Sequence, residues 1–243
     1  VFERCFKNRI PLMLKGPTGC GKSQLVLHMA KKMGLKLFSV ACNEDTNAAD
    51  LLGRYIIKGG ETIWQDGPVT QAVREGGLLY LDELAEARED VIVAIHPLTD
   101  QRREVYLDKI SEVVTANPNF MFVASYNPGY QKGIKKIKAS TKQRFVTISM
   151  TYLPVETEAM LLSELTGLAK DKAAKIVAVA SKIRSMQQYQ LGDSVSTRLL
   201  VRAGQLIVDG MDAREACHVA IAEPLSDDRQ VVSALKDLID LSI

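Results

Sequence analysis

The chain has 243 residues, of which 47% are hydrophobic and 25% are charged, and this composition is typical of a globular protein with a sizeable core. Its 31 basic and 29 acidic residues leave a formal net charge of +2, so the protein as a whole has no strong electrostatic attraction to nucleic acid or to an anionic membrane. No apolar run is long enough to span a membrane and no signal peptide is visible, so we expect a cytoplasmic protein. The four scattered cysteines, Cys5, Cys20, Cys42 and Cys217, lack metal-binding spacing and are expected to be reduced thiols.

A phosphate-binding motif follows the first predicted strand. The apolar run at 10–14 predicts a buried strand, and residues 23–33 carry apolar side chains at helical spacing. Between them, residues 16–23 read Gly-Pro-Thr-Gly-Cys-Gly-Lys-Ser, a complete G-x-x-x-x-G-K-[ST] loop. Its glycines let backbone N–H groups turn toward an anion, Lys22 can reach the β- and γ-phosphates, and the Ser23 hydroxyl can ligate Mg²⁺. The predicted nucleotide-binding residues are Gly16, Pro17, Thr18, Gly19, Cys20, Gly21, Lys22, Ser23 and Gln24.

Four further apolar runs, at 37–41, 78–81, 120–126 and 145–150, predict strands that alternate with helical patterns. Most of these runs are continuous, as expected when helices cover both faces of a parallel sheet. Ligands of such sheets bind beyond the carboxyl ends of the strands, where the phosphate loop also begins. The first part of the chain is therefore predicted to be an α/β domain with a parallel sheet.

Two segments interrupt the alternation of strands and helices. Residues 54–64 place short β-type runs on either side of a Gly-Gly pair at 59–60, and residues 104–114 show a similar pattern around an Asp-Lys turn at 108–109. Both predict β-hairpins inserted into the α/β domain. They could project from the core for a function, or they could be surface hairpins without one.

Two carboxylates end the strand predicted at 78–81. Asp82 and Glu83 follow it directly, and a strand beside the phosphate loop would carry both to the bound phosphates. Asp82 can hold Mg²⁺, directly or through water, and Glu83 can orient the attacking water or accept its proton. Alternatively, the two carboxylates could simply be solvated residues at the end of a strand. Because a phosphate-binding loop precedes them in the chain, we favour a role in hydrolysis.

Three further polar residues are candidates for contacts to the γ-phosphate. Asn127 follows the strand at 120–126 and can hydrogen-bond the attacking water, although an Asn before Pro128 is also a common turn former. Arg144 could reach the γ-phosphate of a neighbouring subunit and neutralise charge in the transition state. Arg198 could contact the nucleotide from the second half of the chain. Taken alone, either arginine is better explained as a surface residue, and both become candidates only within the whole pattern.

The second half of the chain contains only helical patterns. Helices are predicted at 155–166, 171–186, 196–209, 213–222 and 227–241. The chain is therefore predicted to divide into an α/β core at 1–152, which carries both hairpins, and a helical lid subdomain at 153–243.

A basic stretch lies near the end of the predicted core. It consists of Lys132, Lys135, Lys136, Lys138 and Lys142. Because it lacks interleaved aromatic residues, we interpret it as a solvated loop rather than a nucleic-acid patch.

In their order along the chain, these motifs resemble those of an AAA+ P-loop ATPase. Finer stretches resemble the MoxR branch and, within it, the CbbQ/NorQ (NirQ) family, most of all CbbQ. The stretches are residues 14–23, 50–55, 60–68, 96–100, 125–131, 140–145 and 196–199. One departure is Lys142, which stands where the finger motif is expected to have Arg.

The resemblance implies an AAA+ core with a five-stranded parallel sheet, followed by a small all-α lid. Such proteins form homo-hexameric rings that bind ATP and Mg²⁺ between subunits. Five residues would then act within one subunit: Lys22, Ser23, Asp82, Glu83 and Asn127. Arg144 would be a finger donated to the neighbouring subunit, and Arg198 would be a second sensor. The two hairpins would match the helix-2 and presensor-1 insertions, and an adaptor with a von Willebrand factor A domain, similar to CbbO, would be the partner.

The client protein follows from the resemblance alone. CbbQ-type members remodel inhibited Rubisco by releasing sugar phosphates, and NorQ-type members mature nitric oxide reductase by helping to insert a metal. We favour a Rubisco activase subunit, cytoplasmic or associated with a carboxysome, and keep nitric oxide reductase activation as the alternative. A nucleic-acid motor or loader and a small-molecule kinase are more distant alternatives, and neither nucleic acid nor a membrane is expected as a partner.

Overall fold

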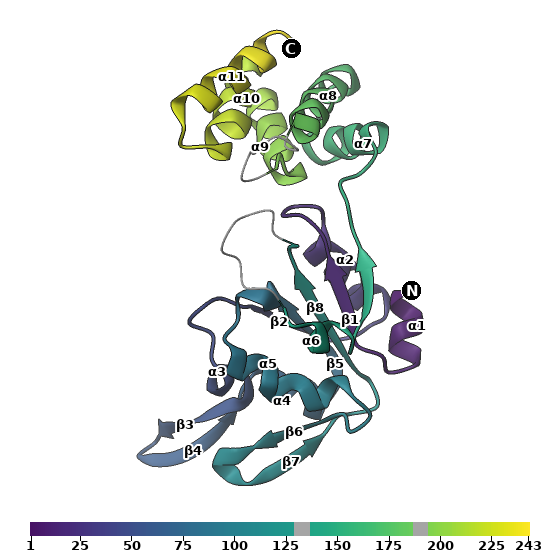
Figure 1. Ribbon diagram of the computed structural model, residues 1–243, viewed down its shortest axis with the longest axis vertical. Helices are drawn as coiled ribbons and strands as arrows, with labels where there is room; N and C mark the ends of the chain where they lie inside the picture. The colour runs from purple at the N-terminus through teal and green to yellow at the C-terminus, as the bar shows by residue number, and fades with distance from the viewer. Residues whose placement is uncertain (129–136, 187–193) are drawn as a thin grey trace. The chain divides into compact units, whose positions relative to one another are not determined.

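The structure is a computed structural model that describes residues 1–128, 137–186 and 194–243 (Figure 1). Contacts within the chain divide it into two compact units. The described residues of the first unit are 1–16, 21–128 and 137–150, and those of the second are 17–20 and 151–243 with the gap noted above. Each unit has its own hydrophobic core.

The first unit is built on a five-stranded sheet. Its strands are β1 (Leu12–Lys15), β2 (Leu37–Ala41), β5 (Gly77–Asp82), β8 (Phe120–Tyr126) and β9 (Val146–Ser149). They lie in the order β2-β5-β8-β1-β9, and every pairing is parallel. The carboxyl ends of β1, β5 and β8 therefore meet at one edge, where ligands of such sheets bind. The predicted α/β class and parallel sheet are confirmed.

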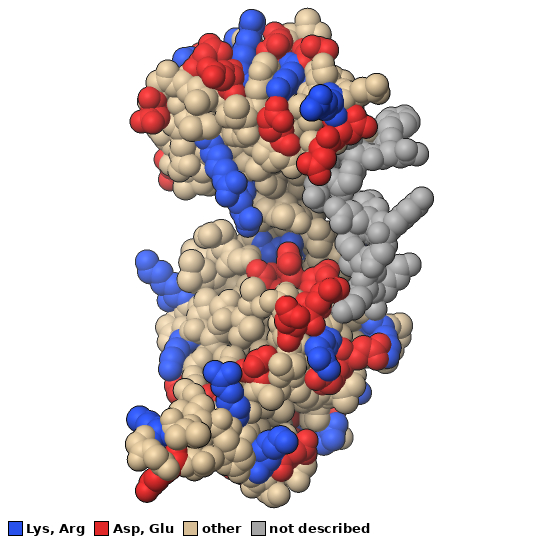
Figure 2. Space-filling model, turned by 90° about the vertical axis from the view of Figure 1, so that its left-hand side faces the viewer, with Lys and Arg blue, Asp and Glu red and all other residues tan. Residues whose placement is uncertain are grey.

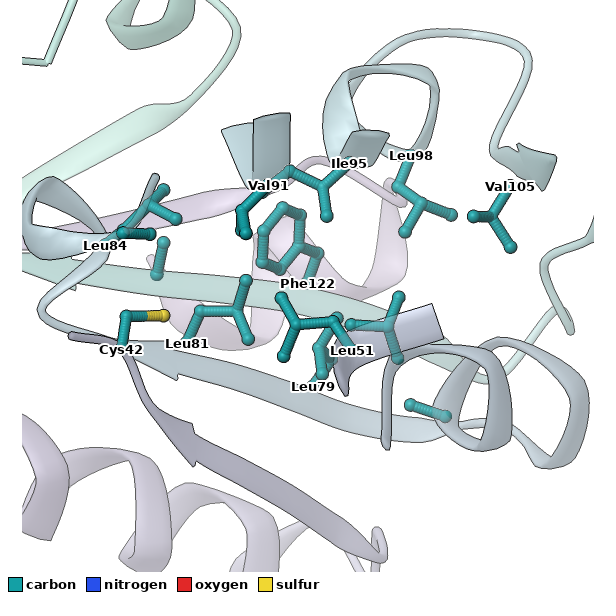
Figure 3. Packing of buried hydrophobic residues seen from close by; sticks show 14 of the residues in the cluster. Cys42, Leu51, Leu79, Leu81, Leu84, Val91, Ile95, Leu98, Val105 and Phe122 are labelled. Atoms are coloured by element: carbon teal, nitrogen blue, oxygen red, sulfur yellow. The ribbon is translucent and has the colours of Figure 1, made fainter. Parts of the chain in front are cut away.

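Helices cover both faces of this sheet. They are α1 (Phe2–Lys7), α2 (Lys22–Lys32), α3 (Ala48–Leu52), α4 (Pro68–Glu75), α5 (Glu89–Ile95) and α6 (Ala139–Lys142). Successive residues of a strand point to opposite faces, so Leu79 of β5 packs with Val91 of α5 in one cluster (Figure 3). Tyr80, the next residue, packs with Val26 of α2 in a second cluster. The sheet is thus the middle of three layers.

Two antiparallel hairpins lie outside the sheet. β3 (Gly53–Lys58) pairs with β4 (Glu61–Asp66), and β6 (Glu104–Leu107) pairs with β7 (Glu112–Thr115). The turn of the first hairpin is a glycine pair with φ of 61° and 84°, a conformation that glycine adopts readily. Arg74 of α4 links the hairpins, because its guanidinium lies 2.8 Å from Asp66 and 2.6 Å from Glu112.

The second unit is helical. Its described helices are α7 (Val155–Thr166), α8 (Lys170–Met186), α9 (Thr197–Val208), α10 (Ala213–Cys217), the π-helical turn η5 (His218–Ala222), the 3-10 turn η6 (Glu223–Leu225) and α11 (Arg229–Asp240). The helix predicted at 213–222 is thus an α-helix that continues as a π-helical turn. The predicted all-helical character of this region is confirmed.

Charged side chains of both signs are interspersed on the face of the molecule shown in Figure 2. None of the helices in the described part of the chain is both long and apolar enough to cross a membrane. Of the basic stretch, Lys132, Lys135 and Lys136 lie outside the described residues.

Candidate nucleotide-binding site

The phosphate loop joins the end of β1 to the start of α2. Gly21 precedes the helix with a φ of 95°, in the left-handed region that favours glycine. Lys22 is buried, and its Nζ donates a hydrogen bond to the carbonyl oxygen of Gly16 over 2.8 Å. The first turn of α2 contains no acidic residue and no side-chain cap. An anion at this helix end would therefore meet backbone N–H groups without competition from a carboxylate of the helix itself.

Ser23 and Asp82, the predicted metal-holding pair, lie side by side. Ser23 Oγ donates a hydrogen bond to Asp82 Oδ2 over 3.0 Å. Asp82 ends β5, while Ser23 begins α2, so the contact joins the phosphate loop to the carboxyl edge of the sheet. Mg²⁺ prefers oxygen ligands and is usually held by one or two protein groups together with nucleotide phosphates. A hydroxyl and a carboxylate in this position fit that requirement.

Three hydroxyl groups hold the Asp82 carboxylate. Besides Ser23, Tyr80 Oη donates to Oδ1 over 2.7 Å, and Ser125 Oγ donates to the same oxygen. Burial raises the pKa of Asp82, but these hydrogen bonds and the charge of Lys22 together lower it by more, so the pKa lies below its ordinary value. Asp82 is therefore ionised at neutral pH, as a metal ligand must be.

Glu83 has an unusual backbone conformation at the end of β5. Its φ is 55°, which is uncommon for a residue with a side chain. Its backbone N–H donates to Ser125 Oγ over 3.1 Å, and its side chain is exposed. The carboxylate is thus accessible to water next to Asp82.

Asn127 lies directly after β8 in the first unit, and the residue is half-buried. It stands two residues beyond Ser125, which contacts Asp82. Because β8 lies between β5 and β1 in the parallel sheet, the residue that follows β8 lies at the same carboxyl edge as Asp82.

The two predicted arginines lie in different units. Arg144 is between α6 and β9, and its Nη1 donates to Asp100 Oδ2 over 3.3 Å. Arg198 is the second residue of α9 in the second unit and is exposed. The structure therefore brings Lys22, Ser23 and Asp82 together within the first unit, and the roles of all the predicted site residues, both arginines included, stay predictions.

Sequence reasoning missed Tyr80 and Ser125 as part of this site. Both lie in apolar runs that predict strands, and the motifs assign neither hydroxyl a role in the site. A signal was present, because Tyr80 stands two residues before Asp82 and Ser125 two before Asn127. Residues at this spacing on a strand point to the same face, so a hydroxyl there is a candidate partner for the polar residue that follows.

The family of this chain follows from two matches to family models. Residues 11–145 match the AAA domain of the dynein-related subfamily, and residues 158–242 match the CbbQ/NirQ/NorQ C-terminal domain. The chain is therefore an AAA ATPase, a class of proteins that bind ATP. More particularly, it belongs to the CbbQ/NirQ/NorQ family.

Relatives of this family are similar over nearly the whole chain. The denitrification regulatory protein NirQ of Pseudomonas aeruginosa is 53% identical, covering 100% of this chain and 94% of its own length. Protein CbbQ of Hydrogenophilus thermoluteolus is 50% identical over 97% of this chain and 88% of its own, and protein NorQ of Paracoccus denitrificans is 49% identical over 98% and 88%. A solved structure of a candidate ATPase from Cytophaga hutchinsonii shares the fold, with a TM-score of 0.54 at 17% identity over 98% of this chain and 86% of that one.

Proposed function

We propose that this chain binds ATP together with Mg²⁺ and hydrolyses the γ-phosphate. The observation that carries the proposal is the contact of Ser23 Oγ with Asp82 Oδ2 at 3.0 Å, beside the exposed Glu83. It supports the proposal because a hydroxyl at the start of α2 and a carboxylate at the end of β5 could together hold a metal beside the phosphates of a nucleotide.

Each residue of the site has a separate task in this proposal. Lys22, which donates to the Gly16 carbonyl in this structure, would bind the β- and γ-phosphates of a nucleotide, and Ser23 and Asp82 would hold the metal, whose charge would offset that of the phosphates. Glu83 orients the attacking water and accepts its proton, and Asn127 donates a hydrogen bond that fixes the water or the phosphate. A prearranged set of charged and polar groups of this kind stabilises the transition state chiefly by electrostatics.

The proposal extends to a ring of identical subunits. Arg144 would be donated to the γ-phosphate of the neighbouring subunit, and Arg198 would report the nucleotide state to the helical region. The exposure of Arg144 supports this role. Although its guanidinium pairs with Asp100, 34% of the side chain is exposed and is therefore accessible to another subunit. A hexamer and a partner with a von Willebrand factor A domain are inferred from the family resemblance.

For the client protein, we now favour the denitrification type over the Rubisco type. The sequence motifs alone favoured CbbQ. Similarity over the full chain supports the denitrification type, since NirQ of Pseudomonas aeruginosa is 53% identical over all 243 residues. We infer that the chain uses ATP to activate nitric oxide reductase, including insertion of its metal.

Release of sugar phosphates from Rubisco is the second candidate function. Its support is CbbQ of Hydrogenophilus thermoluteolus, which at 50% identity is almost as similar. The two functions predict different results in one experiment. The chain and its adaptor are expressed with inactive nitric oxide reductase or added to inhibited Rubisco, and the recovered activity of each is measured. Recovery of reductase activity that is lost in Glu83→Gln supports the first function, and recovery of Rubisco activity alone would replace it with the second.

A further inference from the structure

Two buried hydroxyl groups hold Asp82 without belonging to the predicted metal pair. Tyr80 Oη and Ser125 Oγ both donate to Asp82 Oδ1, whereas Ser23 Oγ donates to Oδ2. A carboxylate oxygen has two lone pairs, so the two donors fill the capacity of Oδ1. Only Oδ2 is left with capacity for a further partner, and it faces Ser23.

Tyr80 is rigidly held between the sheet and α2. Its side chain is 2% exposed and packs with Val26 and Met29 of that helix. Its Oη also lies 3.3 Å from Ser23 Oγ, so one phenol touches both members of the metal pair.

Ser125 connects Asp82 to the next residue of the site. Its side chain is fully buried, and its Oγ accepts the backbone N–H of Glu83 over 3.1 Å while donating to Asp82. The hydrogen bond to Glu83 supports the left-handed backbone conformation, which is strained for a residue with a Cβ. One serine hydroxyl thus orients both carboxylate residues.

We propose that Tyr80 and Ser125 are positioning residues that turn Asp82 Oδ2 toward Ser23 and thereby set the affinity of the site for Mg²⁺. The inference rests on the proposed function, because it assumes that a divalent ion is held by Ser23 and Asp82. Hydrogen-bond partners of metal ligands orient those ligands, and removing one typically weakens metal binding by about 10–100-fold.

The two residues are expected to differ in a measurable way. Tyr80 Oη bonds the metal pair rather than the backbone of Glu83, so Tyr80→Phe should weaken metal binding and should lower kcat at saturating Mg²⁺ less than Ser125→Ala does. Ser125 also holds Glu83, so Ser125→Ala weakens metal binding and additionally lowers kcat at saturating Mg²⁺. A general loss of packing would not produce this split.

The experiment measures the Mg²⁺ concentration that gives half-maximal binding of a fluorescent ADP to the full chain, without turnover. Tyr80→Phe and Ser125→Ala should each raise that concentration by about 10–100-fold, while affinity for the nucleotide in EDTA stays unchanged. The matched control is Tyr126→Phe, which removes the hydroxyl of another buried tyrosine. The ring of Tyr126 lies under the Lys142 ammonium group, and its hydroxyl is not among the groups that bond Asp82. It should behave as the wild type does.

Circular dichroism shows whether each positioning variant is folded. If one variant does not fold, the Mg²⁺ titration of the other tests the inference by itself. A Mg²⁺ requirement equal to that of the wild type in the folded variants would overturn the inference while leaving the proposed function intact. A wild-type protein whose nucleotide binding does not respond to Mg²⁺ at all would overturn the proposed function as well. Equal weakening by Tyr126→Phe would also overturn the inference, since the effect would then not depend on Asp82.

Discussion

Arg144 Nη1 donates a hydrogen bond to Asp100 Oδ2 over 3.3 Å within one subunit. Asp100 also accepts hydrogen bonds from the guanidinium of Arg102, at 2.7 Å and 3.1 Å. Chiefly through Arg102, these interactions lower the pKa of Asp100 to about 2, so its charge persists across the physiological range. The pair keeps the Arg144 guanidinium in a defined place, with 34% of its side chain exposed.

The first prediction concerns this arginine. Arg144→Ala should lower ATP hydrolysis by about 10³–10⁵-fold if the side chain acts as a finger on the transferred phosphate. Subunits with Arg144→Ala mixed with Lys22→Ala subunits should regain part of the activity, because some interfaces then combine an intact phosphate loop with an intact arginine. Phosphate release from mixtures at varied ratios measures the effect.

Arg102→Ala is the matched control, since it removes the other guanidinium on Asp100 but no proposed catalytic group. It should reduce hydrolysis far less than Arg144→Ala. Mixtures that regain no activity would show that the arginine acts within its own subunit or not on the phosphate.

The second prediction uses the four cysteines. Cys20 lies in the phosphate loop and is partly exposed, whereas Cys5, Cys42 and Cys217 are buried. Burial raises the pKa of Cys42 and Cys217 to about 12, so neither forms a thiolate near neutral pH. N-ethylmaleimide should therefore modify Cys20 first and block nucleotide binding.

Mass spectrometry locates the modification, and fluorescent ADP reports binding. Prior incubation with ADP and Mg²⁺ should slow the modification, and Cys20→Ser should bind nucleotide whether treated or not. Loss of binding in treated Cys20→Ser would assign the effect to another cysteine.

The third prediction concerns a buried ion pair in the helical unit. Glu158 is fully buried and accepts hydrogen bonds from both terminal nitrogens of Arg184 at 2.6 Å and 2.9 Å, and from Thr197 Oγ1 at 2.5 Å. Removing one partner of such a pair leaves an uncompensated buried charge, so Arg184→Ala should destabilise this unit by about 3–5 kcal/mol.

Urea unfolding followed by circular dichroism measures this loss. The control is Lys182→Ala on the same helix, whose side chain is exposed and whose change should stay within about 0.5 kcal/mol. Because Thr197 precedes Arg198, a loosened Glu158 should also disturb the start of α9. An Arg184→Ala protein as stable as the control would contradict this account of the helical unit.

Elements with strong local patterns were predictable from the sequence, and those fixed by distant contacts were not. The strands at 37–41 and 120–126 and the helix at 155–166 have the predicted bounds, because each is a periodic or continuous apolar run ended by polar or turn residues. Helix α1 was not predicted. It has only 6 residues and is stabilised by burial of Phe2 and Cys5 against the sheet rather than by its own pattern.

The candidate site divides in the same way. Lys22, Ser23, Asp82 and Glu83 stand out because their motifs are local and their order along the chain is characteristic. The partners that orient them do not stand out, because Tyr80–Ser23 and Ser125–Asp82 contacts span 57 and 43 positions. Such pairs form only once the order of strands is known.

The fourth prediction separates binding from hydrolysis. Lys22→Ala should weaken nucleotide binding, since the phosphates lose the cation that lies at the start of α2, and hydrolysis should fall with it. Fluorescent ADP and ATP titrations measure the affinity. Lys15→Ala, at the end of β1, is a control for loss of a lysine near the loop and should leave the affinity unchanged. Equal affinities in Lys22→Ala and the wild type would argue against nucleotide binding at this loop.

Phosphate release by the wild type and by Glu83→Gln, measured with ATP and Mg²⁺ at equal nucleotide occupancy, tests the central claim most directly. We predict that the wild type releases phosphate, and that Glu83→Gln binds ATP with unchanged affinity but releases phosphate about 10²–10⁴-fold more slowly, because the water has lost its base. Release by Glu83→Gln at the wild-type rate, or no release by the wild type, would contradict the assignment of this site to ATP hydrolysis.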